Sequence, residues 1–341
     1  MHREATLGDY GFATSALGFG TASIFHEPSA TARQRLLRSA LDAGIRHFDV
    51  APIYGLGLAE GELGRALRSQ RERVVVVTKL GIGVTPLARM IGRVQSPARK
   101  VLQKLPSLQQ QARETAASPT SGKLGGLLYR NTFDAAAAQR SLERSLSELG
   151  VEYLDVLMLH DPEPSQLNAP EMYDFLERAR ASGKIRAWGV AGEVGPTARV
   201  IDELGGAAPV AQIRDDIFRG ESLPTPVVRS DYLISFGVLG EALPKIFVHV
   251  TANDERIRQW TNAVGADCSS HHVIATLLLK DAIRANPRGT VLYSTTRPER
   301  LQETAALFSE ELSPTDASLD AFRELVRSQL GPNDAVSKDA K

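Results

Sequence analysis

Residues 47–64 read HFDVAPIYGLGLAEGELG and join an expected strand to an expected helix. Asp49 lies near the carboxyl end of that strand, Tyr54 follows on the loop, and the helix is expected to begin near Leu58. In α/β barrels, the side chains that carry the chemistry lie at the carboxyl ends of the strands and on the loops that follow them. The stretch therefore predicts a barrel strand with a functional site at its carboxyl end.

Outward from this stretch, short β-rich runs alternate with amphipathic helical runs, a pattern typical of a parallel sheet with helical crossovers. The eight expected strands are Ala16–Gly20, Ile45–Val50, Val74–Lys79, Tyr153–His160, Ile185–Ala191, Pro209–Asp215, Tyr232–Val238 and Thr290–Ser294. The expected helices are Ala32–Ala43, Glu60–Ser69, Ala135–Leu149, Pro170–Ser182, Pro196–Leu204, Ser270–Ala285 and Pro298–Leu307. An N-terminal hairpin is expected at residues 5–14. This order predicts a (β/α)8 TIM barrel that forms one domain over residues 1–330, followed by a mobile C-terminal tail at residues 331–341. No G-x-G-x-x-G motif follows an early strand, which argues against a Rossmann domain.

The composition is that of an ordinary globular protein. Forty basic and forty acidic residues cancel, so no overall field draws the chain to nucleic acid or to an anionic membrane. Cys268 is the only cysteine, which excludes an intrachain disulfide and fits a reducing compartment. No apolar run approaches bilayer length, and the first residues lack the apolar core of a signal peptide. We therefore expect a cytoplasmic protein.

Two segments interrupt the alternation of strands and helices. No strand is expected between residues 82 and 132, and residues 241–267 are expected to be a long connection. The first segment is a basic insert with a single acid, Glu114, and its basic residues are Arg89, Arg93, Arg99, Lys100, Lys104, Arg113, Lys123 and Arg130. One hypothesis is a partly helical lid that favours acidic substrates or binds a partner. The alternative, a solvated loop, carries at least equal weight.

Several motifs together make the sequence resemble the aldo-keto reductase superfamily. They are LGFGTAS (residues 17–23), HFDVAPIYG (47–55), VVVVTK (74–79), EYLDVLMLHDP (152–162), SGKIRAWGV (182–190) and RPERLQET (297–304). The resemblance covers nearly the whole chain, and it implies a catalytic tetrad of Asp49, Tyr54, Lys79 and His160. Each motif is weak alone, but the four residues occur in the expected order on the expected strands.

The chemistry of these side chains agrees with the resemblance. Tyr54 would act as general acid and base, with its pKa lowered by Lys79, whose ammonium Asp49 would hold in place. His160 would donate a hydrogen bond to the substrate oxygen and orient it. The hydride must come from a cofactor, because no side chain can donate one. No metal site is expected.

The resemblance also implies where the cofactor binds. Ser294, Thr295 and Thr296 lead into a helix whose N-terminus can receive phosphate, and arginines at its start favour NADP(H) over NAD(H). Two residues would bind the nicotinamide, Gln212 at its amide and Phe236 by stacking on its ring. Relatives usually have Ser-Asn where this chain has Ala191-Gly192. The implied cofactor-binding residues are Gln212, Phe236, Ser294, Thr295, Thr296, Arg297, Arg300 and Glu303.

The expected function is therefore that of an NADP-dependent aldo-keto reductase-like enzyme acting on a carbonyl or alcohol. The segment YGLGLAEGELGRAL (residues 54–67) is most similar to the aldose and fucose dehydrogenase branch, so an NAD(P)-dependent sugar dehydrogenase is the nearest alternative. A third possibility is a nucleotide-sensing barrel with little turnover, similar to the β-subunits of potassium channels. The Ala191-Gly192 pair and the basic insert are the features that favour this third interpretation.

Overall fold

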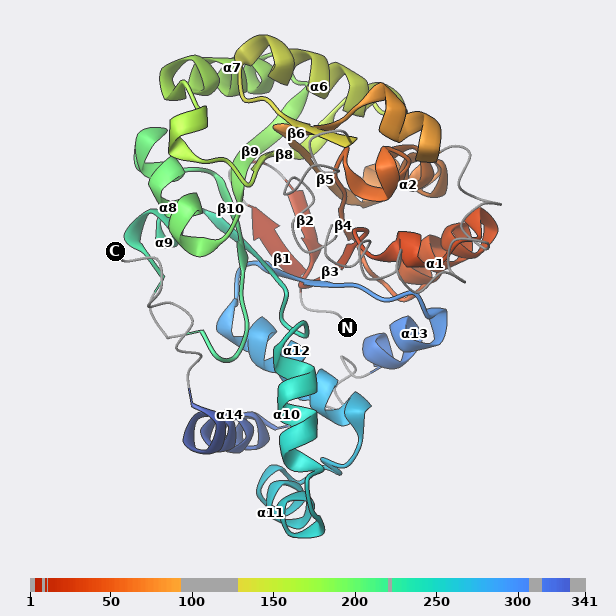
Figure 1. Cartoon of the computed structure of the whole chain (residues 1–341), viewed down its shortest axis with the longest axis vertical. Coiled ribbons are helices and arrows are strands. Elements are labelled where there is room, and N and C mark those ends of the chain that lie inside the picture. Colours follow the sequence, from red (N-terminus) through yellow and green to blue (C-terminus); the bar gives the residue numbers. More distant parts are fainter. Residues whose placement is uncertain are drawn as a thin grey trace.

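The computed structural model of the chain describes residues 4–7, 10, 12–92, 128–219, 223–306 and 315–331. Parallel strands close into an eight-stranded barrel, which confirms the predicted fold class (Figure 1). Each predicted strand is present, and its ends differ by no more than two residues from the prediction. In order around the barrel the strands are β3 (Leu17–Gly20), β4 (His47–Asp49), β5 (Val75–Leu80), β8 (Leu154–His160), β9 (Ile185–Gly192), β10 (Val210–Arg214), β11 (Tyr232–Phe236) and β12 (Thr290–Tyr293).

Successive residues of the strands face opposite sides of the barrel wall. Val75 and Val77 of β5 pack with Val156 of β8 inside the barrel, whereas Val76 packs with Leu157 against the outer helices. Because both faces are buried, the strands read as continuous apolar runs. The same alternation carries Lys79, two residues after Val77, into the mouth of the barrel.

Helices cover the outside of the barrel where the sequence predicts them. They are α1 (Ala30–Asp42), α2 (Ala59–Leu67), α6 (Ala135–Leu149), α7 (Ala169–Ala181), α8 (Val194–Glu203), α12 (His271–Ala285) and α13 (Pro298–Ala306). The bounds of α6 match the prediction because its end signals are strong: Asp134 accepts a hydrogen bond from the Ala137 amide at 2.8 Å, and Gly150 ends the helix in the left-handed conformation. Shorter connecting elements are α9 (Thr225–Val228), η2 (Ile24–His26), η3 (Tyr54–Leu56), η4 (Arg71–Arg73) and η5 (Pro164–Gln166).

The predicted N-terminal hairpin is also present. Strands β1 (Glu4–Leu7) and β2 (Phe12–Ser15) pair antiparallel. Phe12 packs with Val75 and Val210, which are the first residues of β5 and β10. The hairpin therefore closes the amino end of the barrel and leaves the carboxyl ends of the strands for the site.

The expectation of no strand between residues 82 and 132 is wrong. Strand β6 (Ile82–Val84) pairs antiparallel with β7 (Tyr129–Asn131). Each strand has only three residues, and the two strands are far apart in the sequence, so no local sequence pattern predicts that they pair. Residues 93–127, which hold most of the proposed basic lid, lie outside the described residues, as do residues 332–341 of the proposed mobile tail.

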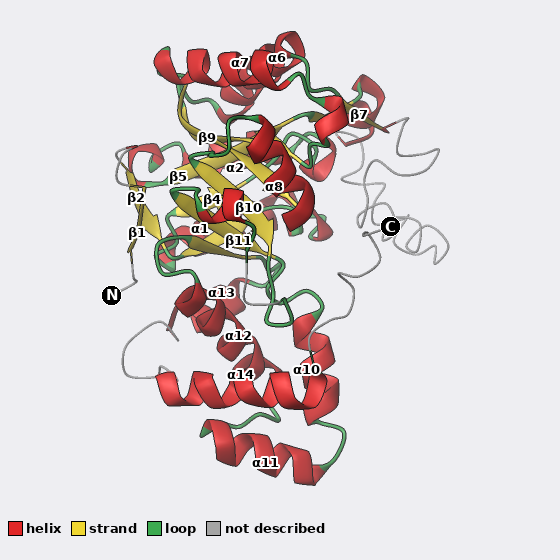
Figure 2. Cartoon of the chain, turned by 90° about the vertical axis from the view of Figure 1, so that its left-hand side faces the viewer, coloured by secondary structure: helices red, strands yellow, loops and turns green. Residues whose placement is uncertain are grey.

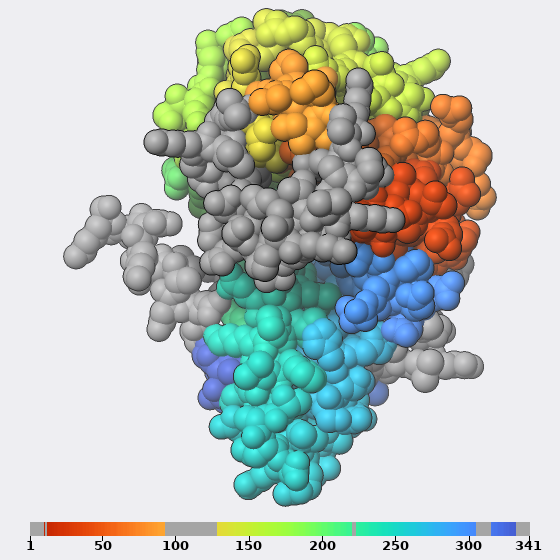
Figure 3. All heavy atoms as spheres, turned by 45° about the vertical axis from the view of Figure 1, so that its right-hand side comes forward, coloured from red at the N-terminus to blue at the C-terminus, as the bar shows by residue number. Residues whose placement is uncertain are grey.

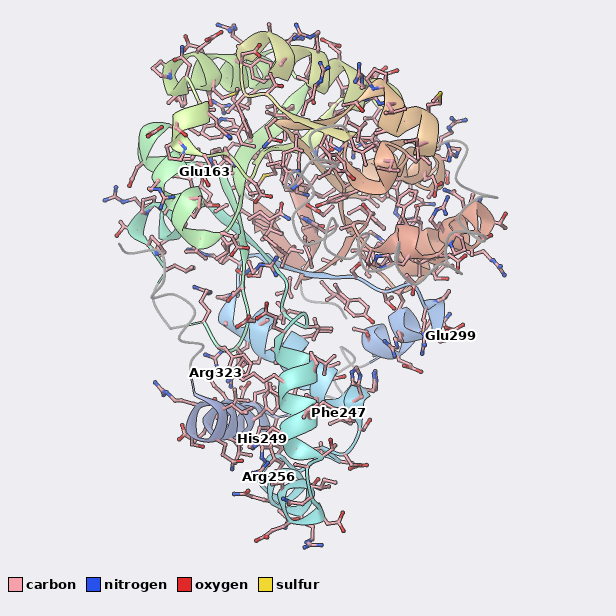
Figure 4. The ribbon with its side chains drawn as sticks, in the orientation of Figure 1. Glu163, Phe247, His249, Arg256, Glu299 and Arg323 are labelled. Carbon is pink, nitrogen blue, oxygen red and sulfur yellow. The ribbon has the colours of Figure 1, made fainter. Side chains whose placement is uncertain are left out.

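The expectation of a long connection at residues 241–267 is also wrong. This segment forms α10 (Ala242–Val250) and α11 (Asp254–Val264), which pack with α14 (Asp316–Leu330) as a helical extension below the barrel in the views of Figures 1 and 2. Figure 4 labels Phe247, His249, Arg256 and Arg323 in this extension. Trp260 of α11 meets Phe322 of α14 edge to face, with ring centroids 5.9 Å apart. Within the described part of the chain, no helix has both the length and the apolar character needed to cross a membrane.

Candidate active site

Asp49 and Lys79 form a buried ion pair at the carboxyl ends of neighbouring strands. Lys79 Nζ donates to the two carboxylate oxygens of Asp49, at 2.6 and 2.7 Å, and to the carbonyl oxygen of Val50 at 3.2 Å. Burial by itself would lower the pKa of Lys79, but attraction to Asp49 and Tyr54 outweighs burial and raises that pKa above its usual value. Lys79 is therefore a cation at neutral pH.

Tyr54 starts the turn η3 on the loop after β4. This turn requires a positive φ of 60° at Gly55, where a Cβ would come within 2.5 Å of the Phe25 ring, so only glycine fits. The centre of the Tyr54 ring lies 5.3 Å from Lys79 Nζ and 6.1 Å from the centre of the His160 ring, which it meets edge to face. The structure thus brings the four residues of the predicted tetrad into one cluster.

The expectation that the pKa of Tyr54 is lowered is wrong, because the combined effect of its surroundings raises this pKa. Burial raises this pKa and the charge of Asp49 adds to the rise, and the opposing effect of Lys79 is too small to reverse it. Sequence reasoning found the cation but could not see how enclosed the phenol is. With its pKa raised, the phenol is protonated at neutral pH and can donate a proton.

His160 ends β8 as a neutral imidazole. Burial, followed by the charge of Lys79, lowers the pKa of His160 to about 3. Its 3.8 Å approach to the Asp161 carboxylate is therefore not an ion pair at neutral pH. His160 Nδ1 has no hydrogen-bond partner among the described residues. A neutral imidazole carries one N–H, so His160 can donate a hydrogen bond to a substrate oxygen.

Gln212 on β10 links the ion pair to a buried acceptor. Gln212 Nε2 donates to Asp49 Oδ2 at 3.1 Å. Gln212 Oε1 has no partner in the part of the chain that the structure describes, although the residue is only 3% exposed. Buried polar atoms are rarely left unpaired, so this oxygen is suited to receive an N–H from a ligand.

Phe236, at the end of β11, is half-buried beside Arg214, which in turn pairs with Glu193; sequence reasoning selected neither charged residue. The Arg214 guanidinium lies 5.3 Å from the centre of the Phe236 ring. Arg214 Nε donates to Glu193 Oε1 at 2.7 Å. The positions of Arg214 at the end of β10 and of Glu193 just after β9 were the available signal, because strand ends at this face form the site.

The remaining predicted residues lie around the start of α13, which packs beside α1 (Figure 3). Ser294 Oγ donates to the Gly20 carbonyl oxygen at 2.8 Å and also hydrogen-bonds with the Ser23 hydroxyl, which joins the loops after β12 and β3. Thr295 Oγ1 accepts from the Arg297 amide at 3.1 Å, and Thr296 follows it half-buried.

A cleft of about 640 Å³ adjoins this loop, between α10, α12 and α13. Arg300 and Glu303 line it, together with His271 and His272 at the start of α12. His272 Nδ1 lies 3.8 Å from Glu303 Oε2. Sequence reasoning missed both histidines because it treated α10, which forms one side of this cleft, as part of a long connection. Both predicted arginines are exposed, but of the two Arg300 lines the cleft and Arg297 lies outside its lining.

Comparisons with known proteins agree with this geometry. The sequence matches the Aldo/keto reductase family over residues 16–213. Pyridoxal 4-dehydrogenase of Microbacterium luteolum is 27% identical over 350 residues, covering 92% of this chain and 96% of that protein. D-threo-aldose 1-dehydrogenase of a Pseudomonas species is 32% identical over 194 residues, covering 55% of this chain and 53% of that protein. A Klebsiella pneumoniae aldo-keto reductase, solved in complex with NADPH, has a TM-score of 0.60 at 23% identity, covering 95% of this chain and 96% of that one. The chain therefore belongs to the aldo/keto reductase family and is an oxidoreductase that acts on carbonyl or alcohol groups.

Proposed function

We propose that this oxidoreductase transfers a hydride between NADP(H) and a small carbonyl or alcohol substrate, with Tyr54 giving and taking the proton. The observation that carries the proposal is the cluster in which Lys79, held by Asp49, lies 5.3 Å from the centre of the Tyr54 ring. Reduction of a carbonyl requires a hydride at carbon and a proton at oxygen. The nicotinamide cofactor supplies the hydride when bound.

Each member of the cluster has a distinct task in this proposal. The protonated Tyr54 gives its proton to the substrate oxygen, and the adjacent Lys79 cation stabilises the phenolate that remains. Neutral His160 donates a hydrogen bond to the same oxygen and fixes its position. In the oxidative direction the Tyr54 phenolate takes the proton of the alcohol.

Two features of the structure fit a nicotinamide dinucleotide phosphate. The unpaired Gln212 Oε1 is suited to accept from the carboxamide. The cleft beside α13 is within the roughly 300–1,000 Å³ of typical ligand pockets, and Arg300 with His271 and His272 offers donors for a phosphate. These donors support NADP(H) over NAD(H), with Ser294 to Thr296 placed before the α13 N-terminus for the remaining phosphates.

The relatives suggest which substrates to test first. The relative that aligns with nearly the whole chain is named for pyridoxal, and another is named for D-threo-aldoses. An aldose dehydrogenase is thus the second candidate function, favoured by the second relative and by the segment at residues 54–67.

The proposal is tested by steady-state kinetics in both directions. NADPH oxidation is followed with an aromatic aldehyde, and NADP+ and NAD+ reduction with pyridoxal and with D-threo-aldoses. We expect turnover with at least one of these substrates. Tight nucleotide binding without turnover on any of them would instead support the nucleotide-sensing interpretation.

The cofactor preference is tested by two arginine variants. Arg300→Ala should weaken NADPH binding roughly 10- to 150-fold and leave NADH binding unchanged, because a charge-assisted bond to the 2′-phosphate contributes roughly 1.5–3 kcal/mol. Arg297→Ala, at the exposed arginine outside the cleft, is the matched control and should change neither. An equal loss of NADH binding in Arg300→Ala would overturn the phosphate role.

A further inference from the structure

Gly192, the last residue of β9, lies against polar atoms at the carboxyl end of the barrel. A Cβ at Gly192 would lie 2.7 Å from Asp161 Oδ1 and 3.4 Å from Thr197 Oγ1. Thr197 Oγ1 is buried and has no hydrogen-bond partner within the described ranges, like Gln212 Oε1 on the neighbouring strand. Gln212 is in register with Ala191. A carboxylate and two unpaired buried oxygens therefore flank the end of β9.

The backbone holds Asp161 against Gly192. The Asp161 amide donates to the Ala191 carbonyl oxygen at 2.8 Å, and Asp161 has a φ of 46°. This left-handed conformation is uncommon outside glycine and is adopted most readily by Asp and Asn. The side chain is 58% exposed, so a ligand at the mouth can reach it.

Asp161 forms no ion pair with a lysine or arginine within 4 Å among the described residues, although the charges of Lys79 and Arg214 act on it from farther away. Among the described residues the one charged-group contact within 4 Å is His160 Nε2 at 3.8 Å, and that imidazole is neutral at neutral pH. A carboxylate accepts hydrogen bonds only, so Asp161 presents acceptors to the mouth without a fixed donor. Gln212 Oε1 presents another acceptor from the other side of Ala191.

We propose that Asp161 accepts a hydrogen bond from the nicotinamide carboxamide and, together with Gln212 Oε1, orients the ring at the barrel mouth. This inference rests on the proposed function. A carboxamide has two N–H groups, and these two acceptors match them in number. Gly192 leaves room for the Asp161 carboxylate in this position, because a side chain there would displace it.

The test measures dinucleotide binding rather than turnover. The dissociation constants of NADPH and of its 3-acetylpyridine analogue, in which a methyl group replaces the amide NH2, are measured by titration calorimetry. Asp161→Gly removes the carboxylate and suits the positive φ. It should weaken NADPH binding about tenfold and change binding of the analogue less than about twofold, because the analogue has no N–H to donate. Asp161→Asn keeps an acceptor oxygen and the backbone conformation, and should restore most of the NADPH affinity.

The matched control is Glu163→Gln, which removes a neighbouring carboxylate beside α8 (Figure 4). It should leave both dissociation constants unchanged. The control thus distinguishes the loss of the Asp161 hydrogen bond from the loss of one negative charge near the site. If the unaltered protein binds neither dinucleotide, the proposed function itself fails. If it binds NADPH but Asp161→Gly binds both ligands as tightly as before, or loses both equally, the inference on Asp161 is overturned while the proposed function stands. A changed substrate KM with unchanged dissociation constants would also overturn it.

Discussion

Asp49 and Asp155 are both buried carboxylates on barrel strands, Asp49 at the carboxyl end of β4 and Asp155 near the amino end of β8. Their side chains are 4% and 1% exposed. Asp49 holds the single ammonium of Lys79. Asp155 instead lies 2.8 Å from Arg71 and 3.3 Å from Arg186, and it accepts from the Val76 amide at 2.8 Å.

The difference lies in what surrounds each carboxylate. At the amino end, the guanidiniums of Arg71 and Arg186 lie 4.3 and 4.6 Å from the centre of the Tyr153 ring, so two permanently charged groups are fixed against an aromatic face. At the carboxyl end, a lysine lies beside the phenol of Tyr54. The Lys79 ammonium can stabilise the phenolate that forms when Tyr54 gives up its proton. The two guanidiniums at the amino end instead stack on the Tyr153 ring and hold a fixed arrangement. We therefore assign the Asp155 cluster to stability and the Asp49 cluster to chemistry.

The largest contrast is expected between two tyrosine variants. Tyr54→Phe should lower kcat by about 10²–10⁴, because it removes the proposed general acid, while the dissociation constant for NADPH stays within about twofold. Tyr153→Phe keeps the ring that carries the arginines and loses only the hydroxyl that accepts from Arg186 at 3.2 Å. It should leave kcat unchanged. Comparable losses of kcat in both variants would refute the division between the two ends.

A second contrast separates stability from activity. Asp155→Ala leaves Arg71 without its buried partner and should lower the free energy of unfolding by roughly 3 kcal/mol, the lower end for a broken buried pair. Its kcat per folded molecule should not change. Asp49→Asn should lower kcat strongly, because Lys79 loses the charge that holds it. Urea unfolding and active-site titration of the same samples give both quantities. A fall in kcat per folded molecule in Asp155→Ala would show that the amino end takes part in the chemistry.

The tetrad could be predicted from the sequence because its signals are local. Asp49, Lys79 and His160 each end an apolar run, and a parallel barrel brings all strand ends to one face. Their clustering therefore needed only the strand order. The direction of the Tyr54 pKa shift could not be predicted, because it depends on how fully the folded chain encloses the ring.

Features made by distant segments were also missed. The pairing of β6 with β7 joins residues on either side of the insert. By contrast, α11 has local end signals, an Asn253 N-cap and Gly265 in the left-handed conformation, which the expectation of a long connection overlooked. The approach of Asp161 to Gly192 depends on a left-handed backbone at Asp161, which no spacing in the sequence reveals.

The smallest expected effect concerns His47, which lies between the two carboxylate clusters. His47 is two residues before Asp49 on β4, in register with Val75, the first residue of β5. The residue is fully buried, and neither ring nitrogen has a partner among the residues the structure describes. Burial, with the charge of Lys79, lowers its pKa to about 3 from the ordinary 6.5.

This lowered pKa makes the stability depend on pH with a definite sign. Between pH 6.5 and about 3 the unfolded chain binds a proton at His47 that the folded chain does not, so His47 destabilises the fold progressively as the pH falls. From pH 6.5 to pH 5 the loss should be about 1.5 kcal/mol for this one group. The free energy of unfolding is measured by urea titration at both pH values. Between pH 6.5 and pH 5 it should fall by about 1.5 kcal/mol less in His47→Leu than in the unaltered protein. Parallel curves for His47→Leu and the unaltered protein would mean that the imidazole finds a partner or water in the folded state. In that case the barrel between the two clusters would be polar rather than apolar, and the two ends would not be electrostatically separate.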